Sequence, residues 1–181
     1  MIYVFLADGC EPVEAIAPID FFGRAGVEFK TVAVNGRQAV SKHGVGITAD
    51  MNIDELQLDD TLTGVVLPGG MPGTNNLYAC EKVREAVKFA DDNGKLVCAI
   101  CAAPYVLGEL GVLSGKKATC YPGFEKHLKG AVVTDAGVVA DGNAITARGA
   151  GVAWQFGAAI AAAVVGKEKA DEVLSQIQWI K

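Results

Sequence analysis

Cys101 occupies a position where an α/β protein can activate a nucleophile. It follows the apolar run Leu96–Ile100 and precedes Ala102-Ala103-Pro104, where a helix is expected to begin. A cysteine on such a strand-to-helix turn has the geometry of a nucleophile elbow. The N-terminus of the helix contributes positive potential and free N–H groups, which favour thiolate over thiol. The alternative is that Cys101, like Cys98, is a buried cysteine that serves only as a small apolar residue.

Two other pairs of residues could act together with this thiol. Gly69 and Gly70 end another apolar run and could turn backbone N–H groups toward the same crevice, as an oxyanion hole requires. Glu11 and Glu14 lie three residues apart in the first turn of an expected helix, so both could project to one side. The alternatives are a simple glycine turn and two solvated charges at a helix end.

The histidines restrict the possible mechanisms. There are two, His43 and His127, and neither has a carboxylate at a spacing that suggests a Cys-His-Asp triad, so both are expected at the surface. Cys98 and Cys101 have Cys-x-x-Cys spacing, but no second ligand pair follows and the two straddle the end of a strand. Glycine motifs of the Walker and Rossmann types are absent from the sequence. We therefore expect no metal site and no cofactor.

The elements that must position these residues follow an alternation of short apolar runs and longer helical patterns. This alternation is typical of βα units around a largely parallel sheet, in which ligands bind at the carboxyl ends of the strands. We predict an α/β three-layer sandwich of flavodoxin-like or class I glutamine amidotransferase-like type, with a mostly parallel sheet and a nucleophile elbow, in one domain, 1–181. The predicted strands are 2–7, 27–34, 64–67, 95–100 and 117–120, with edge strands in 39–50 and a hairpin of 132–140 with 144–147. The predicted helices are 11–23, 76–93, one after Pro104 and two after 149.

Composition and charge narrow the class of partner and the compartment. The 181 residues carry a net charge of −5, and their basic residues form no cluster, which makes nucleic acid an unlikely partner. The five cysteines are odd in number and the first residues read as a strand rather than as a secretion signal, so we expect a reducing cytoplasm. Residues 149–166 are uncharged but rich in Ala and Gly, and we expect them to form a buried helix rather than a membrane span.

Four motifs in order give the chain a resemblance to the ThiJ/PfpI superfamily. Within it, the sequence is most similar to the branch that contains the parkinsonism-associated protein deglycase and the bacterial YajL-type proteins. The resemblance extends over nearly the whole chain. Its most specific parts are Glu11-Pro12-Val13-Glu14 with Pro18-Ile19-Asp20, Val65-Val66-Leu67-Pro68-Gly69-Gly70 with Gly73 and Asn76-Leu77, Ala99-Ile100-Cys101-Ala102-Ala103-Pro104, and Thr146-Ala147-Arg148-Gly149-Ala150-Gly151.

The resemblance implies roles for five residues. Cys101 corresponds to the elbow cysteine of the family, with strained backbone geometry, a low pKa and ready oxidation to sulfenic or sulfinic acid. Glu14 corresponds to a protonated glutamate that donates a hydrogen bond to the cysteine sulfur or to a sulfinate oxygen. Gly69 and Gly70, with the N–H of Ala102, would line the oxyanion side.

Three further residues are possible members of the pocket: Tyr121, Cys10 and Arg148. Tyr121 stands where the human deglycase-type pattern has a histidine, so the obvious proton shuttle is missing. Position 102 is alanine and no histidine follows His127, which disfavours the peptidase and glutaminase chemistries of the superfamily.

The resemblance implies a cofactor-independent cysteine enzyme that acts on reactive 2-oxoaldehydes. It would be a glutathione-independent glyoxalase that converts methylglyoxal, or a deglycase that hydrolyses methylglyoxal adducts on protein side chains, and it would form a homodimer. The alternative is a redox-responsive chaperone or oxidative-stress sensor that works through oxidation of Cys101 without turnover. The absence of the pocket histidine favours this alternative.

Overall fold

The apolar runs of the sequence form the central layer of the fold. The computed structural model describes residues 1–180. Its main sheet consists of β1 (Ile2–Leu6), β2 (Phe29–Ala33), β5 (Met51–Asn52), β6 (Gly64–Leu67), β7 (Leu96–Ile100), β10 (Val138–Asp141) and β11 (Ala144–Ala147). The strand order is β10-β11-β7-β6-β1-β2-β5, and all neighbours are parallel except β10 and β11. The central strands β6 and β7 are almost entirely buried, as expected for a sheet covered on both faces.

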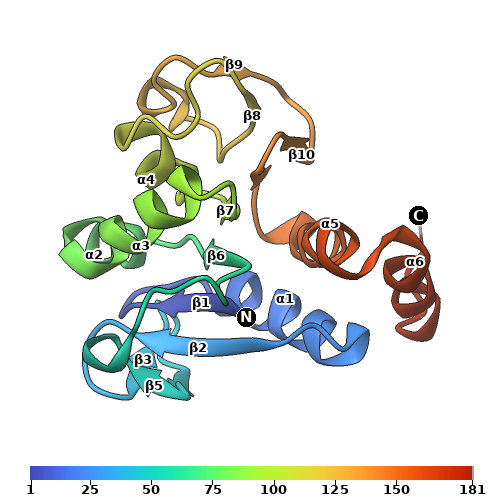
Figure 1. Cartoon of the computed structure of the whole chain (residues 1–181), viewed down its shortest axis with the longest axis horizontal. Coiled ribbons are helices and arrows are strands. Elements are labelled where there is room, and N and C mark those ends of the chain that lie inside the picture. Colours follow the sequence, from blue (N-terminus) through green and yellow to red (C-terminus); the bar gives the residue numbers. More distant parts are fainter. Residues whose placement is uncertain (181) are drawn as a thin grey trace.

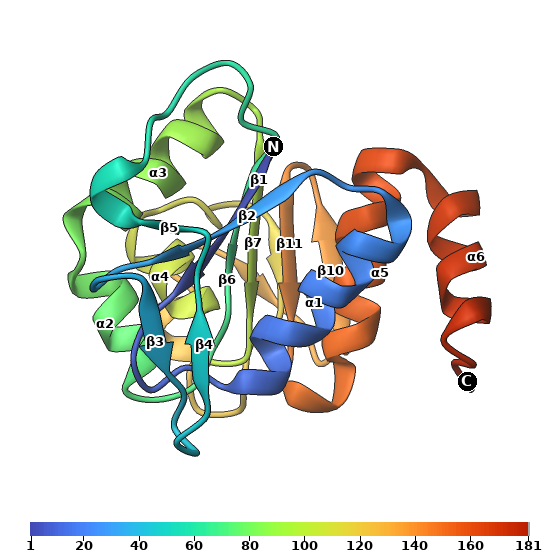
Figure 2. The same cartoon turned by 90° about the horizontal axis from the view of Figure 1, so that it is seen from below.

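Helices cover both faces of this sheet, so the α/β three-layer prediction is confirmed (Figure 2). One face packs against α1 (Pro12–Ala25) and α5 (Ala153–Val165), with α6 (Lys167–Gln176) beside α5. The other face packs against α2 (Gly73–Ala79), α3 (Glu81–Asp92) and α4 (Pro104–Glu109). Figure 1 shows the chain running from β1 in the sheet to α6 at one side of the molecule.

Several short elements lie outside the main sheet. β3 (Gln38–Val40) and β4 (Gly46–Thr48) form a two-stranded antiparallel hairpin, and β8 (Lys117–Ala118) pairs in parallel with β9 (Val132–Val133). The 3-10 helices are η1 (Ile53–Glu55), η2 (Glu125–His127) and η3 (Ala150–Val152). The β3–β4 turn, the residue before η2 and the first residue of η3 contribute to the candidate site described below.

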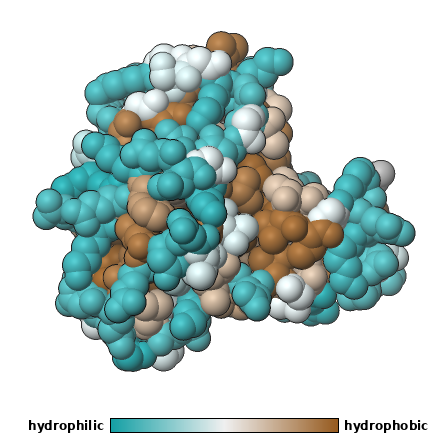
Figure 3. All heavy atoms as spheres, in the orientation of Figure 1, coloured by the Kyte–Doolittle hydropathy of each residue, from teal (hydrophilic) through white to brown (hydrophobic). Residues whose placement is uncertain are grey.

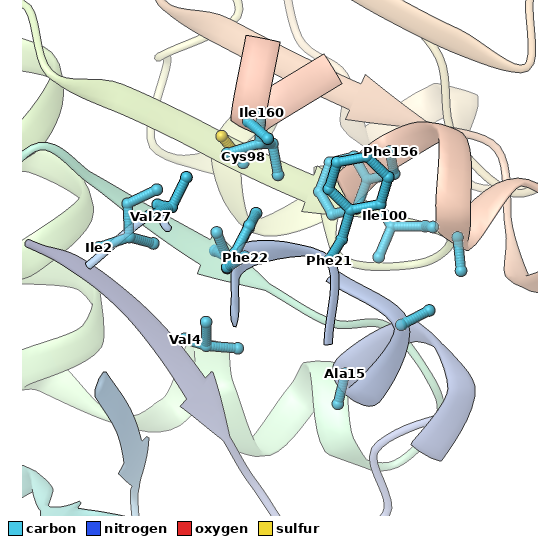
Figure 4. Close-up of a cluster of buried hydrophobic side chains, with 14 of the residues drawn as sticks. Ile2, Val4, Ala15, Phe21, Phe22, Val27, Cys98, Ile100, Phe156 and Ile160 are labelled. Carbon is cyan, nitrogen blue, oxygen red and sulfur yellow. The ribbon is translucent and has the colours of Figure 1, made fainter. Parts of the chain in front are cut away.

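The core between α1 and α5 fixes the position of α1 on the sheet. Phe21 of α1 and Phe156 of α5 are fully buried in one cluster with Ile100 and Cys98 of β7 (Figure 4). Gly157 allows the two helices to approach closely, because a Cβ there would lie 3.0 Å from the Cα of Pro18 and 3.2 Å from the Cβ of Phe21. Close packing of this kind holds the start of α1, and the residues on it, at a fixed place over the strand ends.

Two element predictions were wrong in detail. The single helix predicted for 76–93 is divided into α2 and α3, because Cys80 between them is extended, with ψ 116°. The Arg84 guanidinium donates hydrogen bonds to the carbonyls of Tyr78 and Ala79, the latter at 2.9 Å, and so satisfies the C-terminal carbonyls of α2. The break leaves the apolar face of α3 directed at the sheet.

The predicted hairpin of 132–140 with 144–147 is shorter than expected. Only β10 pairs with β11, whereas β9 pairs with β8 through hydrogen bonds from Val132 N to Lys116 O and from Thr134 N to Ala118 O. The apolar residues of 132–140 were compatible with pairing to 144–147 or to 117–118. The structure pairs Val132 and Val133 with 117–118, where the carbonyls of Lys116 and Ala118 accept these bonds.

The uncharged stretch 149–166 forms η3 and the 13-residue α5. In Figure 3 an apolar surface lies over α5, between the body of the molecule and α6. Within residues 1–180, none of the helices combines the length and apolar character that crossing a bilayer would require.

Candidate active site

Cys101 lies directly after β7 in a backbone conformation that a side chain rarely adopts. Its φ is +64°, in the left-handed region, which carries a cost for a residue with a Cβ. Two backbone hydrogen bonds hold it there: Cys101 N donates to Ala147 O at 2.8 Å, and Cys101 O accepts from Tyr121 N at 2.7 Å. Two strand ends and the Tyr121 loop therefore determine where the sulfur points.

Glu14 projects from the first turn of α1 into the interior beside Cys101. Its side chain is only 1% exposed, and its Oε2 accepts a hydrogen bond from Gly69 N at 3.0 Å. The carboxyl group also forms a hydrogen bond with the Cys101 thiol. Its other oxygen, Oε1, is buried and has no hydrogen-bond partner among the described residues. Burial raises the pKa of Glu14 to about 7, with a smaller upward contribution from the charge of Glu11. The Glu14 carboxyl is thus poised to hold or release a proton near neutral pH.

The two glycines after β6 have different tasks. Gly70 has φ +89°, and its N–H, together with that of Ala102, donates to the Cys101 sulfur. Gly69 differs from the expectation that it lines the oxyanion side, because its N–H is directed at Glu14. A Cβ at position 69 would lie 2.6 Å from both the Cβ of Cys101 and Oε2 of Glu14, so only glycine lets the thiol and the carboxyl meet.

The charge balance around the sulfur corrects one expectation from the resemblance. Burial, followed by the charge of the Glu14 carboxylate, raises the pKa of the Cys101 thiol to about 12, whereas a low pKa was expected. The N–H groups of Ala102 and Gly70 act in the opposite direction. Thiol and carboxyl are coupled, so the thiolate becomes favourable when Glu14 holds the proton. The pair therefore gains or loses its more acidic proton near neutral pH, and the N–H groups of Gly70 and Ala102 favour the sulfur anion.

The sulfur faces a cavity of about 310 Å³ at the carboxyl ends of the strands. Ten residues line this cavity: Glu11, Glu14, Lys42, Gly70, Met71, Cys101, Ala102, Tyr121, Phe124 and Ala150. The structure therefore brings together four of the predicted site residues, namely Cys101, Glu14, Gly70 and Ala102, and adds Tyr121, which was named as a possible pocket residue. Its position fits the open side of the cavity, since Tyr121 is half-exposed.

Three lining residues were missed by the sequence analysis: Lys42, Met71 and Phe124. Glu11, which was interpreted as a possible solvated charge, forms an ion pair with Lys42 inside the cavity, with Nζ and Oε2 2.7 Å apart. Lys42 comes from the turn between β3 and β4, and nothing in its local sequence indicates that this turn reaches the strand ends. The hydrogen bond of Lys42 N to Cys10 O, at 3.0 Å, brings it there.

Cys10 and Arg148 do not line this cavity. Cys10 is fully buried, and burial raises the pKa of its thiol to about 11. Arg148 lies at a neighbouring cavity of about 410 Å³ that shares Tyr121 and Ala150 with the first, and it forms an ion pair with Asp135. No group of three or more His, Cys, Asp or Glu side chains within residues 1–180 is arranged to hold a metal ion.

Comparison with known proteins agrees with this fold. The chain matches the DJ-1/PfpI family over residues 1–163. It is 40% identical to Protein dj-1beta of Drosophila melanogaster over 94% of this chain and 92% of that protein. It is 32% identical to the Parkinson disease protein 7 homolog of Danio rerio, also over 94% and 92%. The chain belongs to the DJ-1/PfpI family.

Solved structures give the same result. Oxidized Toxoplasma gondii DJ-1 has a TM-score of 0.94 at 28% identity, covering 99% of this chain and 98% of that one. Drosophila melanogaster DJ-1beta has a TM-score of 0.92 at 36% identity, with the same coverage. The chain spans 39% and 44% of the length of the Arabidopsis thaliana proteins DJ-1 homolog B and A, which are 38% identical to it.

Proposed function

We propose that this protein is a cofactor-independent cysteine enzyme that detoxifies 2-oxoaldehydes. The observation that carries the proposal is the meeting of the Cys101 sulfur, the Glu14 carboxyl and the Gly70 and Ala102 N–H groups at one cavity. A nucleophile, an acid–base group with a pKa near operating pH and an oxyanion site are what addition to an aldehyde requires. The family membership is consistent with such a role.

The first step forms a bond between the Cys101 sulfur and the aldehyde carbon. The thiol proton passes to Glu14, and the sulfur electron pair attacks the carbonyl carbon, so the negative charge moves to oxygen. The N–H groups of Gly70 and Ala102 are placed to stabilise that oxyanion, and Glu14 then returns its proton to give a neutral hemithioacetal. Glu14 is left ionised and able to act as a base.

The second step is an internal transfer of hydrogen and electrons. Glu14 removes the proton from the former aldehyde carbon and delivers it to the neighbouring carbonyl carbon, through an enediol. The first carbon becomes a thioester and the second becomes a secondary alcohol. Water then cleaves the thioester, which releases the 2-hydroxy acid and the Cys101 thiol. A methylglyoxal molecule and one water give lactic acid, and no external oxidant or reductant is consumed.

The same site could act on adducts of methylglyoxal with protein side chains. Cys101 would displace the amine or thiol of the adduct and form the same hemithioacetal. Glyoxalase and deglycase activities thus share one intermediate. The free aldehyde reaches it by addition alone, whereas an adduct also releases the protein amine or thiol, which leaves with the thiol proton.

A redox role is the second candidate function, favoured by the absence of histidine among the residues that line the cavity. In this role Cys101 is oxidised to the sulfinate by peroxide, and protonated Glu14 donates a hydrogen bond to a sulfinate oxygen. The unpartnered Oε1 of Glu14 and the N–H groups of Gly70 and Ala102 could all serve such a group. The protein would then signal or assist stress responses without turnover.

The test compares lactate formation from methylglyoxal, without glutathione, by the reduced wild type and by Glu14→Gln. We expect turnover in the wild type and a loss of at least about 100-fold in Glu14→Gln, because an amide cannot relay the proton. The sulfinate of Cys101 should still form in the variant on treatment with peroxide, since the amide can donate a hydrogen bond. Equal turnover in both proteins would disprove the mechanism. No turnover in a wild type whose Cys101 is shown by mass spectrometry to be reduced would favour the redox role.

We also propose a homodimer, supported by apolar side chains that are exposed on α1. Val13 and Ile16 are 42% and 44% exposed, and an apolar surface lies over the adjacent α5 (Figure 3). Light scattering on the purified protein should give twice the 18.8 kDa of the chain, and a monomer mass would contradict this.

A further inference from the structure

Lys42 is a cation in the candidate active site to which the proposed chemistry assigns no role. Among the described residues that line the cavity with Cys101, it is the one that carries a positive charge. Its ammonium group bonds to Oε2 of Glu11 at 2.7 Å. The imidazole Nε2 of His43, which is well exposed, lies 3.8 Å from the same oxygen.

The backbone holds Lys42 at the cavity independently of its side chain. Lys42 N donates to Cys10 O at 3.0 Å, and Gly9 N donates to Val40 O at 2.8 Å. Asp8 adds a third bond by accepting from Val40 N at 2.7 Å. The β3–β4 hairpin is therefore tied to the loop that follows β1, and a change of the Lys42 side chain leaves these bonds in place.

The ammonium group lies at the open side of the cavity, and the thiol lies deeper. The Lys42 side chain is 36% exposed, whereas Glu14 behind the sulfur is almost completely buried. The hydrogen bond to Glu11 raises the pKa of Lys42, and the nearby charges of Glu11 and Cys101 raise it further, so the group stays cationic. An electrophile whose reactive carbon meets the sulfur therefore occupies the same cavity as the Lys42 ammonium.

We propose that Lys42 selects the charge of the electrophile, so that the preferred substrates are 2-oxoaldehydes that carry a carboxylate at the end remote from the aldehyde. The proposal rests on the proposed function for the identity of the reacting group. Glu11 neutralises Lys42 in the empty cavity and keeps it at this position; a substrate carboxylate binds to the remaining N–H donors of the ammonium.

A neutral oxoaldehyde such as methylglyoxal would leave the ammonium unused. The hydroxy acid product carries a new carboxylate at the carbon bonded to the sulfur, where the N–H groups of Gly70 and Ala102 lie. The cation at the mouth is thus spatially separate from the oxyanion site, and it distinguishes substrates by the group that does not react.

The test measures alkylation of Cys101 by iodoacetate and by iodoacetamide, which differ chiefly in charge. In both reactions the thiolate sulfur bonds to the CH₂ carbon and iodide leaves. The rate at each cysteine is followed by mass spectrometry of its peptide. Cys80 is an internal control, because it is half-buried at a different cavity, lined by Val34, Asn35, Asn76 and Ala79.

The variants are Lys42→Met, which keeps length and apolar volume without the charge, and Lys42→Arg, which keeps the charge. We expect Lys42→Met to lower the iodoacetate-to-iodoacetamide rate ratio at Cys101 by about fivefold, as expected for loss of one charge pair in a partly hydrated cavity. Lys42→Arg should keep the wild-type ratio, and the Cys80 ratio should be the same in all three proteins. Raising the salt concentration should lower the Cys101 ratio in the wild type but not in Lys42→Met.

An unchanged Cys101 ratio in Lys42→Met would overturn the proposal, as would an equal fall in Lys42→Arg. A parallel change at Cys80 would do so as well, because it would indicate a general effect of protein charge. None of these outcomes depends on turnover. The proposal for Lys42 can therefore fail while the oxoaldehyde activity is confirmed, and the activity can fail while Lys42 is shown to select by charge.

A second measurement addresses the substrate class directly. The probe is 4,5-dioxopentanoate, a 2-oxoaldehyde with a terminal carboxylate, compared with methylglyoxal. We expect the ratio of kcat/KM for 4,5-dioxopentanoate to that for methylglyoxal to fall about fivefold in Lys42→Met, mainly through KM, and to be restored in Lys42→Arg. An equal ratio in wild type and Lys42→Met would show that Lys42 does not select substrates, and it would contradict the proposal.

Discussion

Cys98 and Cys101 are three residues apart, yet they belong to two different chemical regions. Cys98 lies within β7, fully buried in the core cluster that also contains Ile100 and Ile160 (Figure 4), and burial alone raises its pKa. Cys101 lies just beyond the end of the same strand at φ +64°, next to Glu14 and two N–H donors. The difference teaches that the strand end, not the residue type or its neighbours in sequence, decides which thiol can react.

The largest expected effect comes from replacing Cys101, with replacement of Cys98 as the comparison. Cys101→Ser should lower kcat/KM for methylglyoxal by at least about 1,000-fold, as loss of a nucleophile does. Cys98→Ala should stay within about twofold of the wild type, because Cys98 is buried in the core and does not line the cavity. The assay is lactate formation without glutathione. Similar losses in both variants would mean that the two regions are not chemically distinct.

A pH effect on stability between about pH 4.5 and 7 should come from Glu14 beside the Cys101 turn. The pKa of Glu14 is about 7 in the folded state against 4.5 for the free side chain. Between these values the folded protein retains a proton that the unfolded chain has lost, so stability falls as the pH rises through this window and levels off above pH 7.

The fall in the free energy of unfolding should be roughly 3 kcal/mol. Urea unfolding of wild type and Glu14→Gln at a series of pH values measures it. Glu14→Gln should lack this decrease, and a decrease that persists in the variant would assign it to another group.

Gly69→Ala should separate the Cys101 thiol from the Glu14 carboxyl. The added Cβ would lie 2.6 Å from the Cβ of Cys101 and from Oε2 of Glu14, and 2.7 Å from Ile100 O, so thiol and carboxyl must move apart. We expect about a 100-fold loss of kcat/KM and a cost of about 2 kcal/mol in stability.

Gly23→Ala is the matched control, because it lies in α1 and a Cβ there meets no atom within 4 Å. This variant should be more stable by roughly 0.5–1 kcal/mol and fully active. Full activity of Gly69→Ala would show that contact between Cys101 and Glu14 is not required.

The smallest effect should be the stability cost of removing the core thiol. Cys98→Ala leaves a small gap among fully buried side chains and should cost about 1 kcal/mol. Guanidinium unfolding measures the cost. A much larger loss would indicate a role for Cys98 beyond packing.

The sequence pattern was sufficient to predict the parallel strands, whereas the pairing of Cys101 with Glu14 was implied by the family resemblance. Parallel strands such as β6 and β7 are uninterrupted apolar runs, and their ends can be located from Gly69 and Cys101 in the sequence. The direction of the Gly69 N–H could not be predicted, because a glycine turn leaves the orientation of its peptide open. The helix break at Cys80 depends on a side chain, Arg84, that bonds back to the preceding helix.

Lys42 could not be predicted for a different reason. Its place at the cavity depends on hydrogen bonds between the β3–β4 hairpin and the loop after β1, about 30 residues earlier in the chain. The low pKa expected for Cys101 also failed, because the resemblance does not include the balance between burial, Glu14 and the two N–H donors.

The β3–β4 hairpin, which lies outside the main sheet, has an evolutionary consequence. Under the proposed role of Lys42, mutations in its turn would alter which molecules the protein accepts without disturbing the main sheet or the strand ends that carry the thiol. Paralogues that share the elbow can therefore diverge in substrate preference through changes in a few residues around position 42, while the reacting residues stay the same.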